Sequence, residues 1–528
     1  MTPGTAVAPG TSAARPEAPA PPADFVRSGA VVAGARFLSM AASLVRSAMV
    51  AAAFGAGRVT DAFFVALFVP ETIQLRLMGP LIGAFVPVLV QHLSLGDRRA
   101  AGRLIGTALL GTLALATAGA VAGFLVPGPL VAAIAPGFEP ETQALAAGAL
   151  RLLLPLAVFT TSATVLEGVL SAHRKFAVSA LAPVLGSAAT IACLAACGTA
   201  SGVQGLALAF LLGGVVACAI QVPAFLRLGF RPERPLGLGD PAVRRILWLM
   251  LPIFGDQVVG LVVRCVENNL ASRLDAGSIS ALGYALRLHG APVAVFALGL
   301  GIVALPALAS HHAREDGGRF RETAAAGLRC LTLICVPIAA FFLLASRDLV
   351  RLFYQYGSFD AAAVEDTARV LRWLTPGLLG QAAALFLCRA LYAQERPGAI
   401  LWTSAGTAAF NVAWDLATVP WLGVNALALG ASLTWLLYAA CLHRTLVRAP
   451  GMEGGWGLRS FFARVGVATG VMAAAVGLGG ALLPSGGGAA FRCAVLGAAG
   501  LAAFLPACAA LGVREVTGLL RRLRGETR

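Results

Sequence analysis

Charged residues are scarce in this chain. They make up 12% of the 528 residues, whereas hydrophobic residues make up 58% and the mean hydropathy is +0.82. A typical soluble domain carries about 25% charged residues. The composition therefore excludes a soluble globular protein and predicts an all-α integral membrane protein, for which length does not give a count of soluble domains.

Lysine is nearly absent. Lys175 is the only one, so arginine supplies almost all of the positive charge behind the formal net charge of +15. In a membrane protein, such an excess indicates cytoplasmic loops and contacts with anionic membrane lipids. We therefore expect membrane lipids as partners and no nucleic acid.

Catalytic and metal-binding motifs are also missing. The chain contains no GxxxxGK[ST], HExxH or GxSxG sequence. Its ten cysteines form no CxxC pair and none lies near a histidine at metal-ligand spacing, which predicts free thiols in apolar surroundings. We predict that the protein is not an enzyme and needs no cofactor, with Na⁺ as a possible coupling ion.

Long hydrophobic segments are what the chain has in abundance. A helix needs about 20 residues to cross a bilayer. Fourteen segments of this kind are predicted, at 29–54, 61–92, 101–126, 143–171, 178–199, 204–226, 243–271, 278–309, 322–345, 362–392, 399–418, 423–446, 461–482 and 490–513. They predict two pseudo-symmetric six-helix lobes, 28–230 and 240–446, followed by two trailing helices within 458–513.

The ends of the chain and the alternate loops indicate its orientation. Residues 1–27 predict a disordered tail without the order of a signal peptide, and residues 514–528 predict a basic tail. Loops on the side of both termini carry about five times as many basic residues as loops on the other side. The positive-inside rule therefore predicts that both termini are cytoplasmic.

Three arginines interrupt the hydrophobic segments: Arg46 in the first, Arg76 in the second and Arg287 in the eighth. A charge in the hydrocarbon costs at least about 2.5–3.5 kcal/mol and normally faces a polar interior. A guanidinium binds phosphate through two parallel N–H groups. The three side chains therefore predict a pyrophosphate site; the alternatives are a structural pair of Arg76 with Glu71, or snorkelling.

The first two segments are joined by the turn FGAGRVTDAFF, residues 54–64. Gly55 and Gly57 permit a tight turn, and Thr60 with Asp61 predicts the capped start of the next helix. We therefore expect Gly55, Gly57 and Asp61 to form a gate or turn element.

A second polar set consists of Glu267, Asn411 and Asp415. Asn411 and Asp415 are four residues apart and share one helix face. Their oxygens suit a hard cation such as Na⁺, or a proton relay. The alternative is a structural pair of Glu267 with Arg264, one turn away.

The first helix pair also carries a family resemblance. The run VRSAMVAAAFGAGRVTDAFFVALFVPE resembles the opening of the lipid II flippase family (MurJ, also called MviN), part of the multidrug/oligosaccharidyl-lipid/polysaccharide exporter superfamily. Four further stretches agree in order: APGF at 135–138, LEGVLSAHRKFAVSALAPVL at 166–185, YALRL at 284–288 and LFYQYGSFD at 352–360.

The resemblance implies roles for particular residues. It places the family's essential arginines on Arg46, Arg76 and Arg287, and its sodium site on Glu267, Asn411 and Asp415, with Ser432 or Thr434 as further candidates. The chain departs from the family pattern in four places. Met40 stands where a second arginine is usual, Ser47 where an acidic residue often follows, and Leu286 where Asp is common. The stretch QLRLMGPLIG at 74–83 stands where the family has two adjacent arginines and a downstream Glu-Gly.

Together these features predict a flippase of the bacterial inner membrane. By alternating access, it would move a polyprenyl-pyrophosphate-linked peptidoglycan precursor, lipid II, from the inner to the outer leaflet. The resemblance implies cell-wall synthesis machinery as a further partner. The alternatives are a flippase for another lipid-linked glycan and a cation-coupled drug exporter, which would need carboxylates in its main cavity.

Overall fold

The computed structural model describes residues 23–173, 175–198, 201–230, 237, 239–484 and 488–523. These residues form helices joined by short turns, with no β-strand among them. In this part of the chain ten helices are long and apolar enough to cross a membrane, or eleven if one bent pair is a single span. The all-α membrane fold is confirmed, whereas the count of fourteen spans stays a prediction.

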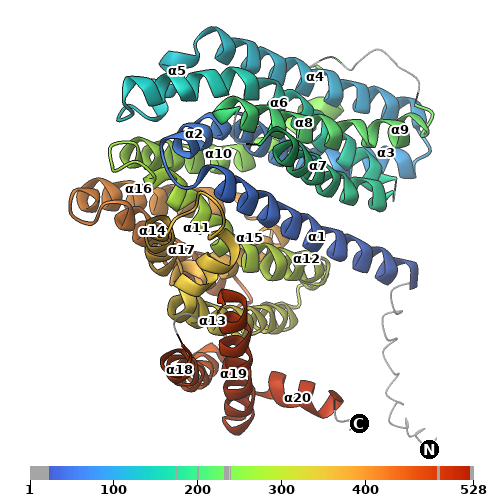
Figure 1. The fold of residues 1–528 in the computed structure, drawn as a ribbon. Helices are drawn as coiled ribbons and strands as arrows, with labels where there is room; N and C mark the ends of the chain where they lie inside the picture. The colour runs from blue at the N-terminus through green and yellow to red at the C-terminus, as the bar shows by residue number, and fades with distance from the viewer. Residues whose placement is uncertain are drawn as a thin grey trace, which may run out of the picture.

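The first group of helices forms the upper part of Figure 1, coloured blue to green. It comprises α1 (Ala23–Phe54), α2 (Arg58–Thr72), η1 (Ile73–Leu77), α3 (Met78–Ser94), α4 (Arg98–Leu125), α5 (Pro127–Ile134), α6 (Pro140–Ala172), α7 (Phe176–Cys197), α8 (Gly202–Ala219) and α9 (Gln221–Leu226). Helix α6 packs against α2, α4 and α8, while α7 packs against α1 and α8.

The second group begins with α10 and lies mainly below the first in Figure 1. It comprises α10 (Pro241–Ala271), α11 (Ser278–Pro292), η2 (Val293–Ala297), α12 (Leu298–Ala313), α13 (Gly317–Tyr354), α14 (Ala361–Leu374), α15 (Gly377–Ala393), α16 (Pro397–Leu422) and α17 (Val424–Val447). The bent pair is α14 with α15. Contacts of α10 with α3 and of α11 with α2 join the two groups.

The start of α1 differs from the sequence prediction. The helix begins at Ala23, so the last five residues of the predicted tail 1–27 are helical. The prolines of the tail end at Pro22, and a chain without proline can continue as a helix. Residues 1–22, and residues 524–528 of the other predicted tail, lie outside the described residues.

The second helix of each group changes to π-helical geometry part of the way along. Segment η1 follows Pro70 and contains Arg76, while η2 directly follows Pro292 and comes shortly after Arg287. Proline removes a helical hydrogen bond, and π-helical segments occur often at functional sites. The two predicted arginine positions thus lie near matching irregularities.

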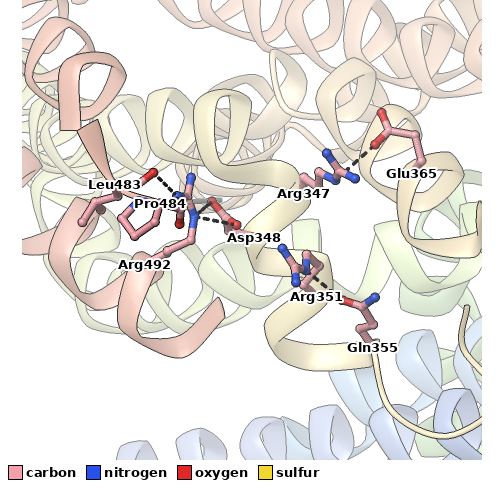
Figure 2. Close-up of polar contacts among 8 residues, drawn as sticks. All are labelled: Arg347, Asp348, Arg351, Gln355, Glu365, Leu483, Pro484 and Arg492. Carbon is pink, nitrogen blue, oxygen red and sulfur yellow. Dashed lines mark hydrogen bonds and ion pairs between the residues drawn. The ribbon is translucent and has the colours of Figure 1, made fainter. Parts of the chain in front are cut away.

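The trailing helices α18 (Leu458–Leu482) and α19 (Ala489–Ala510) pack against each other and against α13, and α20 (Arg514–Leu523) follows them. An ion pair between α19 and α13 holds the trailing helices against α13, as Figure 2 shows. Arg492 Nε lies 3.1 and 3.2 Å from the two carboxylate oxygens of Asp348. Its Nη1 donates to the carbonyls of Leu483 and Pro484 just after α18, at 2.9 and 3.0 Å.

We expect Asp348→Ala to lower the free energy of unfolding by about 3–5 kcal/mol, the usual cost of removing one partner of a buried ion pair. Both side chains are only 12% exposed, so Arg492 would lose its counter-ion in a largely buried place. Thermal unfolding of the detergent-solubilised protein measures the change.

The matched control for that measurement is Glu365→Ala. It breaks the nearby pair of Arg347 and Glu365, at 3.5 Å, whose side chains are 62% and 38% exposed (Figure 2). It also breaks the longer pair of Glu365 with Arg372, at 3.9 Å, where the arginine is 43% exposed. Exposed pairs contribute about 0–1 kcal/mol. Equal stability losses in the two variants would show that the Asp348–Arg492 pair does not fasten the trailing helices.

Candidate functional site

The turn between α1 and α2 is built for close contact with other segments. Gly55 has φ +66°, and a Cβ there would lie 2.6 Å from the carbonyl oxygen of Ser358. Gly57 is extended, and its N–H donates to Thr60 Oγ1 at 2.9 Å. The helix thus begins earlier than predicted: Gly57 is its N-cap, and Thr60, its third residue, stabilises the start by bonding back to Gly57. Gly55 allows the chain to approach the loop after α13.

Asp61 does not cap its own helix. Its Oδ2 accepts the N–H of Gly277 at 2.6 Å, and its Oδ1 accepts the N–H and hydroxyl of Ser280 at 2.7 and 2.6 Å. Gly277 is the N-cap of α11 and has φ +97°. Asp61 is 3% exposed, so a buried carboxylate of the first group caps a helix of the second.

Two further contacts hold the same turn. The hydroxyl of Tyr284 on α11 donates to the carbonyl of Gly55 at 3.2 Å. After α13, the N–H of Ser358 donates to the carbonyl of Ala52 at 2.8 Å. Segments that are far apart in the sequence therefore meet at this turn. We call the contacts of Asp61, Gly277, Ser280, Tyr284 and Ser358 the clasp.

Arg46 and Arg287 lie close enough in the interior for their charges to interact. The charge of Arg287 acts on Arg46, and the carboxylate of Glu71 acts on it with the opposite sign. The guanidinium of Arg46 lies over the ring of Phe210, 4.8 Å from its centroid, and that of Arg287 over Phe64 at 4.7 Å. Two like charges thus share one region of the interior.

Arg46 also borders a polar cavity of about 320 Å³ within the first group. Its lining includes Glu71, Gln74, Thr160, Thr164, Glu167, Ser187 and Gln221. Gln221 is 2% exposed, and its side-chain oxygen has no hydrogen-bond partner among the described residues. The cavity thus offers one buried acceptor that a bound molecule or water can satisfy.

Arg76 occupies a different place from the other two arginines. Its Nη1 donates to the backbone and side-chain oxygens of Gln257 on α10, at 3.2 and 3.3 Å. A Cβ at Gly260 would lie 2.5 Å from the same atom, so this glycine makes room for the guanidinium. Arg76 therefore spans the contact between the two groups and does not pair with Glu71.

The predicted cation ligands lie at the α10–α16 contact. Glu267 and Asp415 are 6% and 0% exposed, and the charge of Glu267 acts on Asp415. Asn411 Nδ2 donates to Asp415 Oδ2 at 2.8 Å, while Asp415 Oδ1 has no partner among the described residues. Glu267 also accepts Arg264 Nη1 at 2.7 Å. The structure thus forms the alternative ion pair and also keeps Glu267 near enough to Asp415 for their charges to interact. We call Glu267, Asn411 and Asp415 the carboxylate cluster.

The two further candidates for this cluster differ. Ser432 Oγ contacts the backbone at the α14–α15 bend, donating to Trp373 and Leu374 and accepting from Gly377. Its oxygen is therefore already used. Thr434 Oγ1 is buried and has no partner among the described residues. Gly430 permits the close approach of α17, because a Cβ there would lie 2.5 Å from Asp415 Oδ1.

Sequence reasoning missed several residues of the site. Gln257 and Ser280 are polar residues within predicted spans, and this polarity could have drawn attention to them. Their partners are far away in the sequence, so the contacts themselves could not be predicted. Phe64 and Phe210 gave no signal, because aromatic residues in apolar segments are ordinarily packing residues.

The chain is similar to known proteins of one family. A family model described as Lipid II flippase MurJ matches residues 50–489. The Lipid II flippase MurJ of Burkholderia cenocepacia is 31% identical over 455 residues, covering 83% of this chain and 87% of that protein. The probable lipid II flippase MurJ of Vibrio cholerae is 28% identical, covering 86% and 88%.

Solved structures give the same fold. A lipid II flippase MurJ in an inward closed conformation superposes with a TM-score of 0.77 at 20% identity, covering 93% of this chain and 99% of that one. An inward-facing multidrug resistance transporter of the MATE family and MOP superfamily gives a TM-score of 0.64 at 17% identity, covering 78% and 96%. At these identities the likeness concerns the fold.

Proposed function

Because the chain belongs to the family of the lipid II flippase MurJ, we propose that it moves lipid II from the inner to the outer leaflet of the bacterial cytoplasmic membrane. The observation that carries the proposal is the placement of Arg46 and Arg287 in one interior region. Two adjacent guanidiniums repel each other, and a multiply charged anion such as pyrophosphate removes the repulsion by binding both. The protein acts as a transporter and needs no catalytic group.

We infer that the protein works by alternating access, with the clasp as its gate on one side of the membrane. With the clasp closed, the substrate would enter from the opposite side of the protein. The loops near the α1–α2 turn are poor in arginine, which supports an extracytoplasmic position for the clasp and cytoplasmic positions for both termini. Arg76, which bridges to α10 through Gln257, would engage the pyrophosphate when the two groups of helices separate on that side.

The flippase proposal is tested in two assays. The gene should restore growth to cells depleted of their own lipid II flippase, and the purified protein in vesicles should move fluorescent lipid II between leaflets. A vesicle assay with another polyprenyl-pyrophosphate glycan distinguishes the alternative substrate. Movement of that glycan without movement of lipid II would overturn the proposal, as would a lack of any lipid movement.

A drug exporter of the same superfamily is the rival proposal, and it rests on the shared fold alone. Cationic drugs would require an interior dominated by carboxylates. Arg46 and Arg287 bring two guanidiniums into this interior, where Glu71 and Glu167 line the same cavity as Arg46. A guanidinium attracts anions and repels cationic drugs, so the two arginines favour an anionic substrate.

The coupling ion is proposed from the carboxylate cluster. Glu267, Asn411 and Asp415 would hold Na⁺, since oxygen ligands suit a hard cation and Asp415 Oδ1 is buried without a partner among the described residues. The ion would favour one conformation only through its different affinity for the two states.

We expect Na⁺ to raise the melting temperature of the wild-type protein and to have no such effect on Asp415→Asn. The stabilisation grows as RT ln(1 + [Na⁺]/Kd), about 2.7 kcal/mol at a concentration of 100 Kd. Thermal unfolding is measured in NaCl and in choline chloride at equal ionic strength. Glu71→Gln, which removes a carboxylate outside the cluster, should keep the response. An equal response in both salts would exclude Na⁺ as the ligand.

A further inference from the structure

A chain of aromatic rings connects the two interior arginines. Phe64 of α2 lies beneath the guanidinium of Arg287, and Phe210 of α8 lies beneath that of Arg46. Phe63, the neighbour of Phe64, meets Phe210 edge-on, with centroids 4.9 Å apart and an interplanar angle of 65°. The rings of Phe63 and Phe64 lie 5.8 Å apart. Adjacent residues of α2 therefore connect to both arginines, Phe64 directly to Arg287 and Phe63 to Arg46 through Phe210.

We propose that Phe64 and Phe210 are positioning residues that hold the two guanidiniums by cation–π contact, with Phe63 fixing the ring of Phe210. The inference rests on the proposed pyrophosphate site and assigns it two further residues. A ring beneath the face of a guanidinium leaves the N–H groups at its edge free. Those groups are the ones that bind phosphate oxygens in pairs.

The two rings stabilise the positions of the arginines when no anion is bound. Arg46 and Arg287 repel each other, and long flexible side chains would turn apart. The electron-rich face of a ring attracts a guanidinium regardless of whether an anion is present. The two side chains are thereby kept near their binding positions, which lowers the entropic cost of binding.

The aromatic residues are themselves well fixed. Phe63 is fully buried and Phe210 is 7% exposed. Phe64 packs edge-on against Tyr284, with centroids 5.4 Å apart, and Tyr284 donates to Gly55 in the clasp. Ring position is therefore tied to the state of the clasp, so that opening the clasp would also disturb the support of Arg287.

The test replaces Phe64 or Phe210 with mono-, di- and trifluorinated phenylalanine. Fluorine withdraws charge from the ring face with little change of shape, so it weakens cation–π attraction stepwise. The affinity for inorganic pyrophosphate is measured on the full-length protein in nanodiscs, with melting temperature recorded alongside. We expect affinity to fall stepwise, reaching a loss of about threefold to thirtyfold.

Phe359 is the matched control. It is 2% exposed and packs against the rings of Tyr284 and Tyr354, in the same aromatic cluster as Phe64. Fluorination there should leave pyrophosphate affinity unchanged. Unchanged affinity at Phe64 and Phe210, an equal fall at all three positions, or no pyrophosphate binding by the wild type would overturn the inference. Pyrophosphate binding with the expected fall, but without lipid II movement, would overturn only the proposed function.

Discussion

Arg287→Ala is expected to abolish lipid II movement while leaving the protein folded. Loss of one charged group from a paired anion site costs about 2–5 kcal/mol, which corresponds to at least about 30-fold in affinity. The fold should survive, because the substitution removes a guanidinium that repels Arg46. Growth of flippase-depleted cells and lipid movement in vesicles measure the effect, and the melting temperature reports the fold.

Arg287→Lys and Arg58→Ala complete this experiment. Lysine keeps the charge but cannot present the planar pair of N–H groups, so it should restore only part of the activity. Arg58 lies at the α1–α2 turn in an exposed pair with Glu139, with side chains 54% and 63% exposed, and its loss should have little effect. Growth of the Arg287→Ala cells at the wild-type rate would remove the main support for the pyrophosphate site.

The hydropathy of the chain was sufficient to predict the fold class and the interior arginines. A charge within an apolar segment is unusual enough to identify Arg46 and Arg287 without a structure. Their mutual placement was not predictable, since hydropathy places a residue within its segment but does not identify the neighbouring helix. Arg76 illustrates the limit: its contact, Gln257, is 181 residues away.

The turn motif shows the same difference between what the local sequence predicts and what packing decides. The residues of FGAGRVTDAFF predict a tight turn and a capped helix, and Thr60, the third residue of α2, does bond back to the N-cap Gly57. Asp61 has the chemistry of a cap, but the helix it caps is α11, and Gly277 is 216 residues away. Local propensity identified the cap residue, whereas packing between the two groups selected the helix.

Asp61→Ala is the second substitution with a large expected effect. It would remove the acceptor for two backbone N–H groups and one hydroxyl, all buried, at the start of α11. Hydrogen bonds to a charged group contribute about 1.5–3 kcal/mol each. We therefore expect the closed clasp to lose about 3–5 kcal/mol of stability. A change of this size shifts a two-state equilibrium by at least about 100-fold.

The expected result is a protein that remains folded but no longer moves lipid II, because alternating access requires the clasp to close. Hydrogen exchange gives a direct measure: the amide hydrogens of Gly277 and Ser280 should exchange faster in Asp61→Ala than in the wild type.

Asp360→Ala is the control for this experiment. Asp360 accepts the N–H of Ala363 at 2.8 Å and caps only its own helix, so its loss should cost about 0.5–2 kcal/mol and leave the clasp intact. Unchanged protection of Gly277 and Ser280 in Asp61→Ala, together with normal lipid movement, would show that this carboxylate does not hold the two groups of helices together.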